Sequence, residues 1–358
     1  MQQEFNEISY LRDYFGRDGE ASAAYLTQIV TTCAATVSNL AAVSDNTAAL
    51  ESIASQLESK GVNILSNLLH DKSSFTITEL DIMRVIIATD GTRPSYPVSN
   101  NMPVTSLYDD SDWKNRTDSR AAALRQAISC TGRINIPGGI AGTGFLVAPN
   151  LIMTNRHVLQ AITERNNRTA FVNHVSIDFG CEDLASDGAL NTEILKVIYP
   201  GVNEITTPNH RFMDMALLEI GYREDLPKPM KICAEYEQDA GTGIFLIGFP
   251  NQQKAPLNAG TVYRDFFENF MGYKKVAPGN IITAFDSWPG RFSHDASTLR
   301  GNSGSMVVAI GNESCAMGLH YGGIQGINPE NWAHGLNLFC DPENDVRHIL
   351  DTYGAEYV

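Results

Sequence analysis

The sequence predicts an all-β double antiparallel β-barrel, preceded by a small α-helical N-terminal domain. Apolar residues recur at spacings of three and four in the first 90 residues, as in amphipathic helices. Residues 91–117 contain three prolines and show no periodicity, which is typical of a linker. After Gly132, short apolar runs alternate with turns rich in Asn, Pro and Gly, a pattern that favours closed antiparallel barrels.

Residues 1–90 are expected to form a helical domain for regulation or recruitment. Ala, Leu and Ile recur at helical spacing through Glu20–Leu40 and again through Asn46–Lys60. A third helix is predicted soon afterwards, where Thr78 and Asp81 have the spacing of a capping box. No catalytic pattern is visible here, so we expect a small bundle that packs against a partner or binds one.

Residues 118–358 are expected to form the β domain. A helix over Asp118–Ser129 leads into the first barrel, whose strands end near Ile220. The segment Gly241–Pro250 opens the second barrel, and the aromatic-rich segment Thr261–Lys275 is expected to be a long loop over it. The two glycines near residue 241 do not form a dinucleotide fingerprint, because no third glycine follows at the required spacing. We expect no cofactor and no metal.

Charge and length exclude several classes of protein. The net charge of −15 argues against a nucleic-acid partner, because phosphate binding needs clustered Lys and Arg. No segment approaches the roughly 18 apolar residues of a membrane span, so no membrane partner is expected. The N-terminus lacks the pattern of a signal peptide, and the six cysteines form no C-x-x-C pair. We therefore expect a cytoplasmic protein with reduced thiols, with disulfides as the alternative.

The stretch Leu299–Ser305, Leu-Arg-Gly-Asn-Ser-Gly-Ser, contains a candidate nucleophile. Gly301 and Gly304 flank Ser303, and an apolar run follows. Glycines let the backbone turn sharply and let a substrate carbonyl approach closely. A serine hydroxyl is a weak nucleophile alone and needs an oriented base.

A base and its orienting carboxylate occur upstream. His157 follows two apolar runs that are expected to be strands joined by a Pro-Asn turn. Asp214 begins an otherwise apolar strand, where a carboxylate is costly unless it is hydrogen-bonded. The chain order His157, Asp214, Ser303 is that of the chymotrypsin-type triad. Each residue taken alone has an ordinary structural explanation, and the ordered set favours catalysis.

Residues 130–350 resemble a trypsin-like serine peptidase of the chymotrypsin family, in particular its glutamyl-endopeptidase branch. The resemblance rests on four motifs in order: Gly142-Thr-Gly-Phe-Leu-Val with Thr154-Asn-Arg-His-Val, Asp214-Met-Ala-Leu-Leu, Gly301-Asn-Ser-Gly-Ser and Gly318-Leu-His-Tyr-Gly-Gly. It implies a protein or peptide substrate, attack by Ser303 with His157 as base and Asp214 as its partner, and an oxyanion hole formed by the N–H groups of Gly301 and Ser303.

The resemblance also suggests a specificity. Ser297 stands where trypsin has the aspartate that pairs with Lys or Arg, so a basic side chain would find no counter-charge. Thr298 and His320 match the Thr and His of the glutamyl endopeptidases, and their donors suit a Glu or Asp side chain. The alternative for His320 is packing between the barrels. Tyr321 and Gly322 would offer backbone on which a substrate pairs as an extra strand.

Activation is expected to depart from the trypsin pattern. In trypsin-type zymogens a new N-terminal ammonium pairs with an Asp before the nucleophile, and here that residue is the neutral Asn302. We therefore expect control through a regulatory protein partner that acts on residues 1–90. The leading prediction is a serine endopeptidase. The alternatives are a catalytically silent peptidase fold used as a binding module, and a protease that mainly releases its own N-terminal domain.

Overall fold

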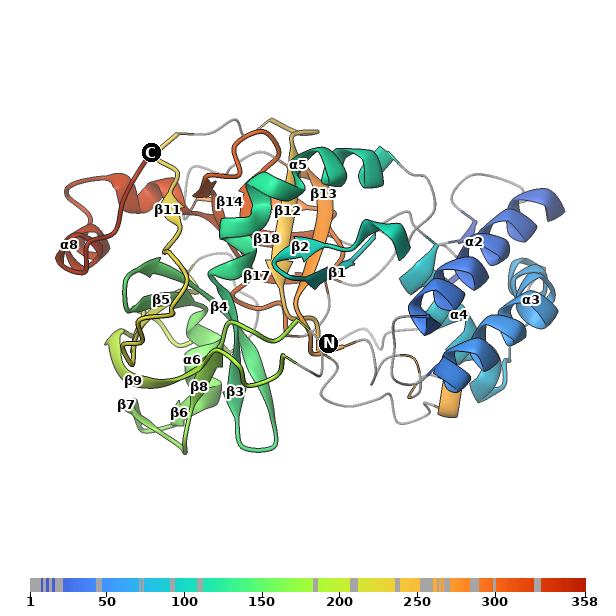
Figure 1. Cartoon of the computed structure of the whole chain (residues 1–358), viewed down its shortest axis with the longest axis horizontal. Helices are drawn as coiled ribbons and strands as arrows, with labels where there is room; N and C mark the ends of the chain where they lie inside the picture. The colour runs from blue at the N-terminus through green and yellow to red at the C-terminus, as the bar shows by residue number, and fades with distance from the viewer. Residues whose placement is uncertain are drawn as a thin grey trace.

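The structure is a computed structural model of the whole chain. It describes residues 8, 11, 12, 15, 16, 22–42, 47–70, 72, 74–90, 94–107, 112–182, 186–206, 212–235, 239–251, 260–262, 264, 266, 271–283, 290–298, 301–324 and 330–358. Three N-terminal helices lie at one end of the molecule and the β-strands at the other (Figure 1). Parts of the segment predicted as a loop over Thr261–Lys275, and Leu299 and Arg300 before the candidate nucleophile, lie outside the described residues.

The helices are α2 (Ala23–Ala41), α3 (Thr47–Leu69) and α4 (Ile77–Thr89), which share one apolar core. The helix predicted over Asn46–Lys60 continues to Leu69. Gly61 does not end it, because Gly61 lies buried against Val30, and a Cβ at Gly61 would come within 2.9 Å of two Val30 carbons.

The capping box of α4 lies two residues earlier than predicted. It joins Thr76 and Glu79: the Thr76 N–H donates to Glu79 Oε2 at 2.7 Å, and the Glu79 N–H donates to Thr76 Oγ1 at 3.2 Å. The prediction of Thr78 and Asp81 was wrong because Asp81 faces inward. It is fully buried and forms an ion pair with Arg84.

The segment predicted as a linker carries secondary structure that joins it to the second barrel. β1 (Tyr96–Ser99) and β2 (Met102–Pro103) form a hairpin, and β1 pairs with β13 (Lys275–Thr283). After a 3₁₀ turn (Thr105–Leu107), α5 spans Asp112–Ser129 and so begins six residues before the predicted start. The domain boundaries themselves stay predictions.

The first barrel is closed by six antiparallel strands in the order β10-β5-β4-β3-β8-β9. These strands are β3 (Thr131–Ile136), β4 (Gly139–Ala148), β5 (Leu151–Thr154), β8 (Ser176–Asp178), β9 (Asn191–Tyr199) and β10 (Ala216–Ile220). Apolar side chains of β4, β5 and β10 fill the barrel core. The short helix α6 (Arg156–Ile162) follows β5, and the small hairpin β6 (Thr163–Glu164) and β7 (Asn167–Phe171) comes next.

The second barrel also has six antiparallel strands. They run in the order β12-β15-β17-β18-β14-β13, and pairing of β12 with β13 closes the ring. Besides β13, these strands are β12 (Gly243–Gly248), β14 (Arg291–His294), β15 (Met306–Ala309), β17 (Gly318–Ile324) and β18 (Glu330–Gly335). A 3₁₀ helix (Leu336–Cys340) and α8 (Asp345–Thr352) end the chain. The predicted fold class, two antiparallel barrels preceded by helices, is confirmed.

One pair of cysteines differs from the expectation of reduced thiols. β11 (Lys231–Ile232) pairs in parallel with β16 (Cys315–Ala316), which brings Cys233 and Cys315 within 5.2 Å at their Cα atoms, and a disulfide joins them. That separation lies within the usual range for disulfides. Cys33, Cys130 and Cys181 are free and buried, and Cys340 is free and partly buried.

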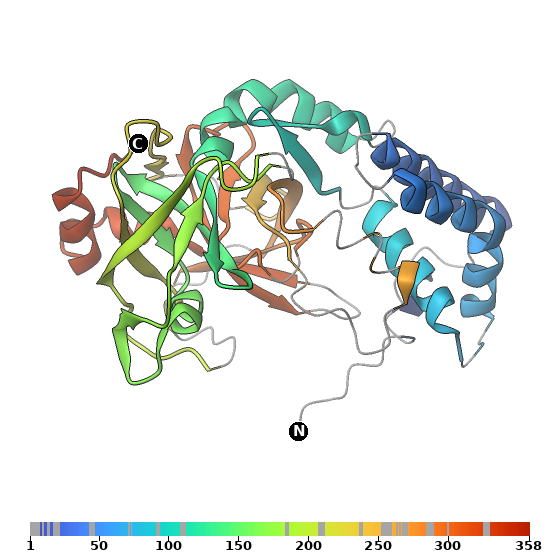
Figure 2. The same cartoon turned by 60° about the horizontal axis from the view of Figure 1, so that its bottom comes forward.

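The helical bundle and the second barrel share core residues. Val262 and Phe266, from the connection between β12 and β13, are buried in the apolar core of the helices. The backbone N–H of Gly260 donates to the buried Asp81 at 2.8 Å. Both views show this short orange segment against the helices (Figures 1 and 2). Among the described residues, no helix combines the length and apolarity needed to cross a membrane.

Candidate active site

His157 and Asp214 lie together because their strands are neighbours. His157 follows the end of β5 and Asp214 precedes β10, and Thr154 of β5 pairs with Ala216 of β10. Asp214 Oδ2 lies 2.6 Å from His157 Nδ1, and Oδ1 accepts the His157 backbone N–H at 2.9 Å. Because an ionised carboxylate only accepts hydrogen bonds, Nδ1 carries the proton and Nε2 is left as an acceptor. The buried carboxylate thus fixes both the position and the tautomer of the imidazole.

Asp214 is also held from the second barrel, by His334 of β18. The backbone N–H of Asp214 donates to His334 Nε2 at 3.0 Å, and the His334 side chain is fully buried. Its ring stacks on Tyr321 of β17, with centroids 4.1 Å apart. The side-chain amide of Asn155 donates to the Asp214 carbonyl at 2.8 Å. The backbone N–H and the backbone carbonyl of Asp214 therefore both have hydrogen-bond partners. The sequence interpretation did not identify His334.

Ser303 lies in a tight turn before β15. Gly301 and Gly304 have φ of +93° and +88°, a region that favours glycine. A Cβ at Gly304 would come within 2.0 Å of the Thr143 carbonyl oxygen, so this turn lies directly against the first barrel. The Gly304 N–H donates to the His320 carbonyl at 2.9 Å. The partly exposed Ser303 therefore lies at the junction of the two barrels.

The structure brings Ser303 to the side of the junction that carries His157. Gly142 links the two, because a Cβ there would lie 3.0 Å from the Ser303 carbonyl oxygen and 2.8 Å from a side-chain carbon of Val158, the residue after His157. Both Ser303 and His157 are described, and no hydrogen bond joins their side chains in this structure. Such bonds often form only in the substrate complex.

The predicted oxyanion donors lie in the same turn. Among the described residues, no backbone-to-backbone hydrogen bond uses the N–H of Gly301 or of Ser303. Gly301 packs against the chain that follows β12, where a Cβ would lie 2.4 Å from the Phe249 carbonyl oxygen. Asn302 is buried, and its Oδ1 accepts a long hydrogen bond from the Ser305 hydroxyl at 3.4 Å.

The predicted specificity residues come from two neighbouring segments. Ser297 and Thr298 follow β14 and are partly buried, whereas His320, Tyr321 and Gly322 belong to β17. The structure therefore brings both predicted walls into the second barrel, beside the Ser303 turn.

Asn331 of β18, which the sequence interpretation missed, changes what Thr298 can offer. The Asn331 side-chain amide donates to the Ala296 carbonyl at 2.9 Å, and its Oδ1 lies 2.5 Å from Thr298 Oγ1. Because the Ala296 carbonyl can only accept, the amide nitrogen must face it, and Thr298 donates its single proton to Asn331. Thr298 is then left only as an acceptor for a substrate.

His320 is buried and neutral. Burial, followed by the charge of His157, lowers the pKa of His320 to about 3. Its Nδ1 lies 3.3 Å from Nε2 of His294, which is also fully buried. A substrate side chain would therefore meet a neutral imidazole without a full positive charge, and the ring also has a hydrogen bond with the Trp332 backbone.

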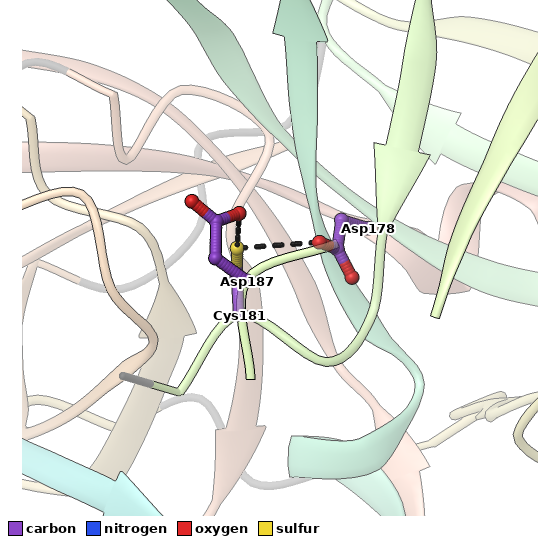
Figure 3. A group of neighbouring side chains, drawn as sticks. All are labelled: Asp178, Cys181 and Asp187. Atoms are coloured by element: carbon purple, nitrogen blue, oxygen red, sulfur yellow. Dashed lines mark hydrogen bonds between the residues drawn. The ribbon is translucent and has the colours of Figure 1, made fainter. Parts of the chain in front are cut away.

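Three residues near the end of β8 form the group that best suits a metal ion. Asp178, Cys181 and Asp187 place one ligand atom each within 4.8 Å of one another (Figure 3). Their donors and acceptors already have protein partners. Gly180 and Gly188 donate to Asp178, Cys181 lies 2.9 Å from Asp187, and Arg133 donates to Asp187 at 2.6 Å. The adjacent guanidinium opposes a second cation, so these contacts serve to hold Gly180, Cys181 and Gly188 near Asp178 and Asp187.

Comparison with known proteins agrees with the fold. Two six-stranded antiparallel barrels in one chain define a protein of the chymotrypsin-like class. Residues 142–317 match the family model of the trypsin-like peptidase domain. This part of the chain is a trypsin-like peptidase domain, and the class of enzyme is serine endopeptidase, a hydrolase. A search of curated proteins finds no match.

Solved structures of serine proteases are similar to part of the chain. A mouse neuropsin, a serine protease expressed in the limbic system of the brain, is 13% identical with a TM-score of 0.45, over 63% of this chain and 95% of its own. A Glu endopeptidase in complex with MPD is 17% identical with a TM-score of 0.45, over 63% and 90%. A serine endoprotease from Yersinia pestis is 19% identical with a TM-score of 0.42, over 65% and 66%.

Proposed function

We propose that the protein cleaves peptide bonds through a triad of His157, Asp214 and Ser303 and an acyl-enzyme. The observation that carries the proposal is the double contact of the buried Asp214 with His157, at 2.6 Å to Nδ1 and 2.9 Å to the backbone N–H. In the neutral imidazole this contact places the proton on Nδ1, so that Nε2 is the nitrogen that accepts the proton of a serine hydroxyl.

The proposed reaction has two halves. Ser303 Oγ attacks the carbonyl carbon of the scissile bond while His157 Nε2 takes the hydroxyl proton. His157 then gives this proton to the leaving amine, which departs and leaves an ester on Ser303. Water, deprotonated by His157, attacks the ester, and the acid product leaves with Ser303 restored. Asp214 stabilises the imidazolium in both halves without taking its proton.

The N–H groups of Gly301 and Ser303 are proposed to stabilise the oxyanion in both halves. Both groups are free of backbone partners among the described residues. Loss of one such donor typically costs about 10²–10³ in rate.

Cleavage after Glu or Asp is the proposed specificity. Support comes from Ser297 in place of a carboxylate, and from the buried His320 beside the Ser303 turn. Since Thr298 donates to Asn331 and the His320 ring has a hydrogen bond with the Trp332 backbone, a substrate carboxylate would compete with Trp332 for the single N–H of neutral His320. A Gln side chain also fits a neutral site, so a peptide library that contains Glu, Asp and Gln at the cleaved position tests this part directly.

Residues 1–90 are proposed to bind a regulatory protein partner. The bundle is in contact with a segment that leads to the predicted oxyanion turn. Met271 packs on the bundle core, and the next residue, Gly272, donates its N–H to the Pro250 carbonyl at 2.7 Å. Asn251, which follows, lies against Gly301, where a Cβ would be 2.8 Å from the Asn251 nitrogen. A partner that shifts the helices would therefore also shift the segment that contacts Gly301 in the predicted oxyanion turn.

Labelling with a fluorophosphonate, followed by mapping of cleavage sites in a protein mixture by mass spectrometry, tests the proposed activity. The Ser303→Ala variant is the control. An adduct on Ser303 and cleavages that vanish in Ser303→Ala are expected. A folded protein that forms no adduct and cleaves nothing would instead be a binding module of the peptidase fold. Cleavage confined to its own residues 91–112 would indicate release of the N-terminal domain.

A further inference from the structure

Thr143 of β4 is fully buried, and its polar groups contact the segments that carry the candidate site. Its backbone N–H donates to the Ser303 carbonyl at 2.8 Å. Its hydroxyl donates to the Gly301 carbonyl at 2.8 Å and accepts the Phe249 N–H at 3.1 Å. Its carbonyl accepts the Thr154 hydroxyl at 2.7 Å.

We propose that Thr143 is a positioning residue that fixes the nucleophile turn, and with it the Ser303 N–H, through its hydroxyl. This inference rests on the proposed peptidase function and extends it to a residue with no direct role in bond cleavage. The two carbonyls that Thr143 binds, those of Gly301 and Ser303, lie on either side of Asn302. The peptide between Asn302 and Ser303, which carries the Ser303 N–H, lies between these two held peptide planes, so its orientation is restrained from both sides.

The hydroxyl is needed because the turn is built from glycine. Gly301 and Gly304 have no side chains that could restrain their backbone torsions, and glycine loses more conformational freedom on folding than any other residue. Within the turn, the Ser305 N–H donates to the Asn302 carbonyl at 2.9 Å, and this bond leaves the Gly301 carbonyl to be held from outside. The Thr143 hydroxyl holds it and also binds Phe249, so one oxygen joins the nucleophile turn to the end of β12.

The same residue connects the nucleophile to the base. Thr154, which donates to the Thr143 carbonyl, ends β5 and lies three residues before His157, which is in the first turn of α6. The chain from Ser303 through Thr143 and Thr154 to His157 crosses from the second barrel to the first by two hydrogen bonds. Thr143 thereby sets the relative placement of the two groups that must exchange a proton.

Three substitutions in the full chain test this role. Thr143→Val keeps the shape of the side chain and both backbone contacts but removes the hydroxyl. Thr143→Ser keeps the hydroxyl. Thr163→Val is the matched control, because Thr163 of the β6–β7 hairpin is also buried and donates its hydroxyl to a backbone carbonyl, that of Leu159, at 2.7 Å.

The expected result is a fall in kcat of about 10²-fold for Thr143→Val, the scale associated with a displaced reacting group, with little change in KM. Thr143→Ser should stay within the same order of magnitude as the unmodified protein, and Thr163→Val should keep its kcat. Equal rates for Thr143→Val and Thr143→Ser, or a kcat for Thr143→Val like that of Thr163→Val, would overturn the proposal.

Hydrogen exchange separates this proposal from the proposed activity. In the Ser303→Ala background, amides of residues 301–305 should exchange faster when Thr143→Val is added than when Thr163→Val is added. This readout needs no turnover, so it holds even if the unmodified protein cleaves no peptide. Equal exchange in the two double variants would show that the hydroxyl does not hold the turn.

Discussion

Asp214 and His334 come from different barrels and are joined by a hydrogen bond from the Asp214 backbone N–H to His334 Nε2, at 3.0 Å. The carboxylate of Asp214 faces the other way, toward His157. One residue therefore links the imidazole of the first barrel to a buried histidine of the second. The effects of this link on the stability of the protein and on the rate of peptide hydrolysis can be measured separately.

His334→Leu should lower both the stability and the rate. It leaves the buried Asp214 N–H without its acceptor, at a cost of about 1–3 kcal/mol in the free energy of unfolding. Because the Asp214 carboxylate stays charged, the loss in kcat should be well below that of Asp214→Asn. Chemical unfolding and peptide hydrolysis measure the two effects. His174→Leu, at a side chain that is 93% exposed, is the control, and an effect of equal size there would contradict the linkage.

Asp214→Asn should lower kcat by about 10⁴, because an amide at this position favours the wrong tautomer of His157. Ser303→Ala should abolish hydrolysis and leave the fold intact, since Ser303 is partly exposed. Circular dichroism checks the fold, and hydrolysis of a small ester checks the rate. Activity close to that of the unmodified protein in either variant would refute the assignment of the triad.

The pH dependence of stability should carry a contribution from His320. Its pKa is lowered in the folded state to about 3, from the ordinary histidine value of 6.5, mainly by burial. Between these two values the unfolded chain binds a proton that the folded protein does not, so stability falls as the pH drops from about 6.5 toward 3. The free energy of unfolding of His320→Gln should therefore change less over this range. Parallel curves for the two proteins would show that His320 is not buried as a neutral group.

The pH dependence of cleavage after Glu should reflect the neutral state of His320. Since His320 stays neutral above about pH 4, binding of a substrate carboxylate should not strengthen as the pH is lowered toward 5. The ratio of kcat/KM for Glu peptides to that for Gln peptides should therefore not rise as the pH is lowered from 8 to about 6, a range in which the substrate glutamate stays ionised. Rates of the two kinds of peptide over this range measure the ratio. A ratio that rises as the pH is lowered would mean that His320 is protonated.

The contact between the bundle and the barrel should affect the active site. Phe266→Ala removes a fully buried ring from the bundle core and should cost about 3–5 kcal/mol in stability. Leu57→Ala, in the same core but on α3, is the matched control. Under folding conditions, Phe266→Ala should change the rate of Ser303 labelling by a fluorophosphonate more than Leu57→Ala does. Equal labelling rates would mean that this contact serves only stability.

The disulfide can be detected by counting the free thiols. With Cys233 and Cys315 joined, four of the six cysteines remain as thiols, and alkylation of the denatured, unreduced protein should add four groups. Six added groups would match the sequence-based expectation of reduced thiols and a cytoplasmic location. Intact-mass measurement distinguishes the two results.

The sequence predicted the parts of the site that sit in local motifs. Turn glycines around Ser303 and the isolated carboxylate before an apolar strand are visible in the sequence, so the fold class could be predicted and the candidate triad chosen. His334 and Asn331 were missed because their roles depend on the register of β18 against β17 and β14. Thr143 was part of a quoted motif, but its contacts span more than 150 residues.

The ends of the helices show the same difference between local sequence signals and long-range contacts. Spacing located the helices of the bundle, yet Gly61 was misleading because the close approach of Val30 makes a glycine useful inside α3. The capping box was placed two residues late because Asp81 faces a partner, Gly260, that lies 179 residues further along the chain. Local signals thus gave the elements, and long-range contacts decided their ends.

The two-point attachment of the helical bundle bears on what a cut in the chain would do. The bundle is joined to the second barrel covalently through the β1–β2 hairpin, and non-covalently through Val262, Phe266 and the Asp81–Gly260 hydrogen bond. A nick between residues 91 and 94 would remove only the first connection. The severed helices would remain bound to the barrel as a two-chain complex. Separating them would require a competitor that binds where Val262 and Phe266 pack.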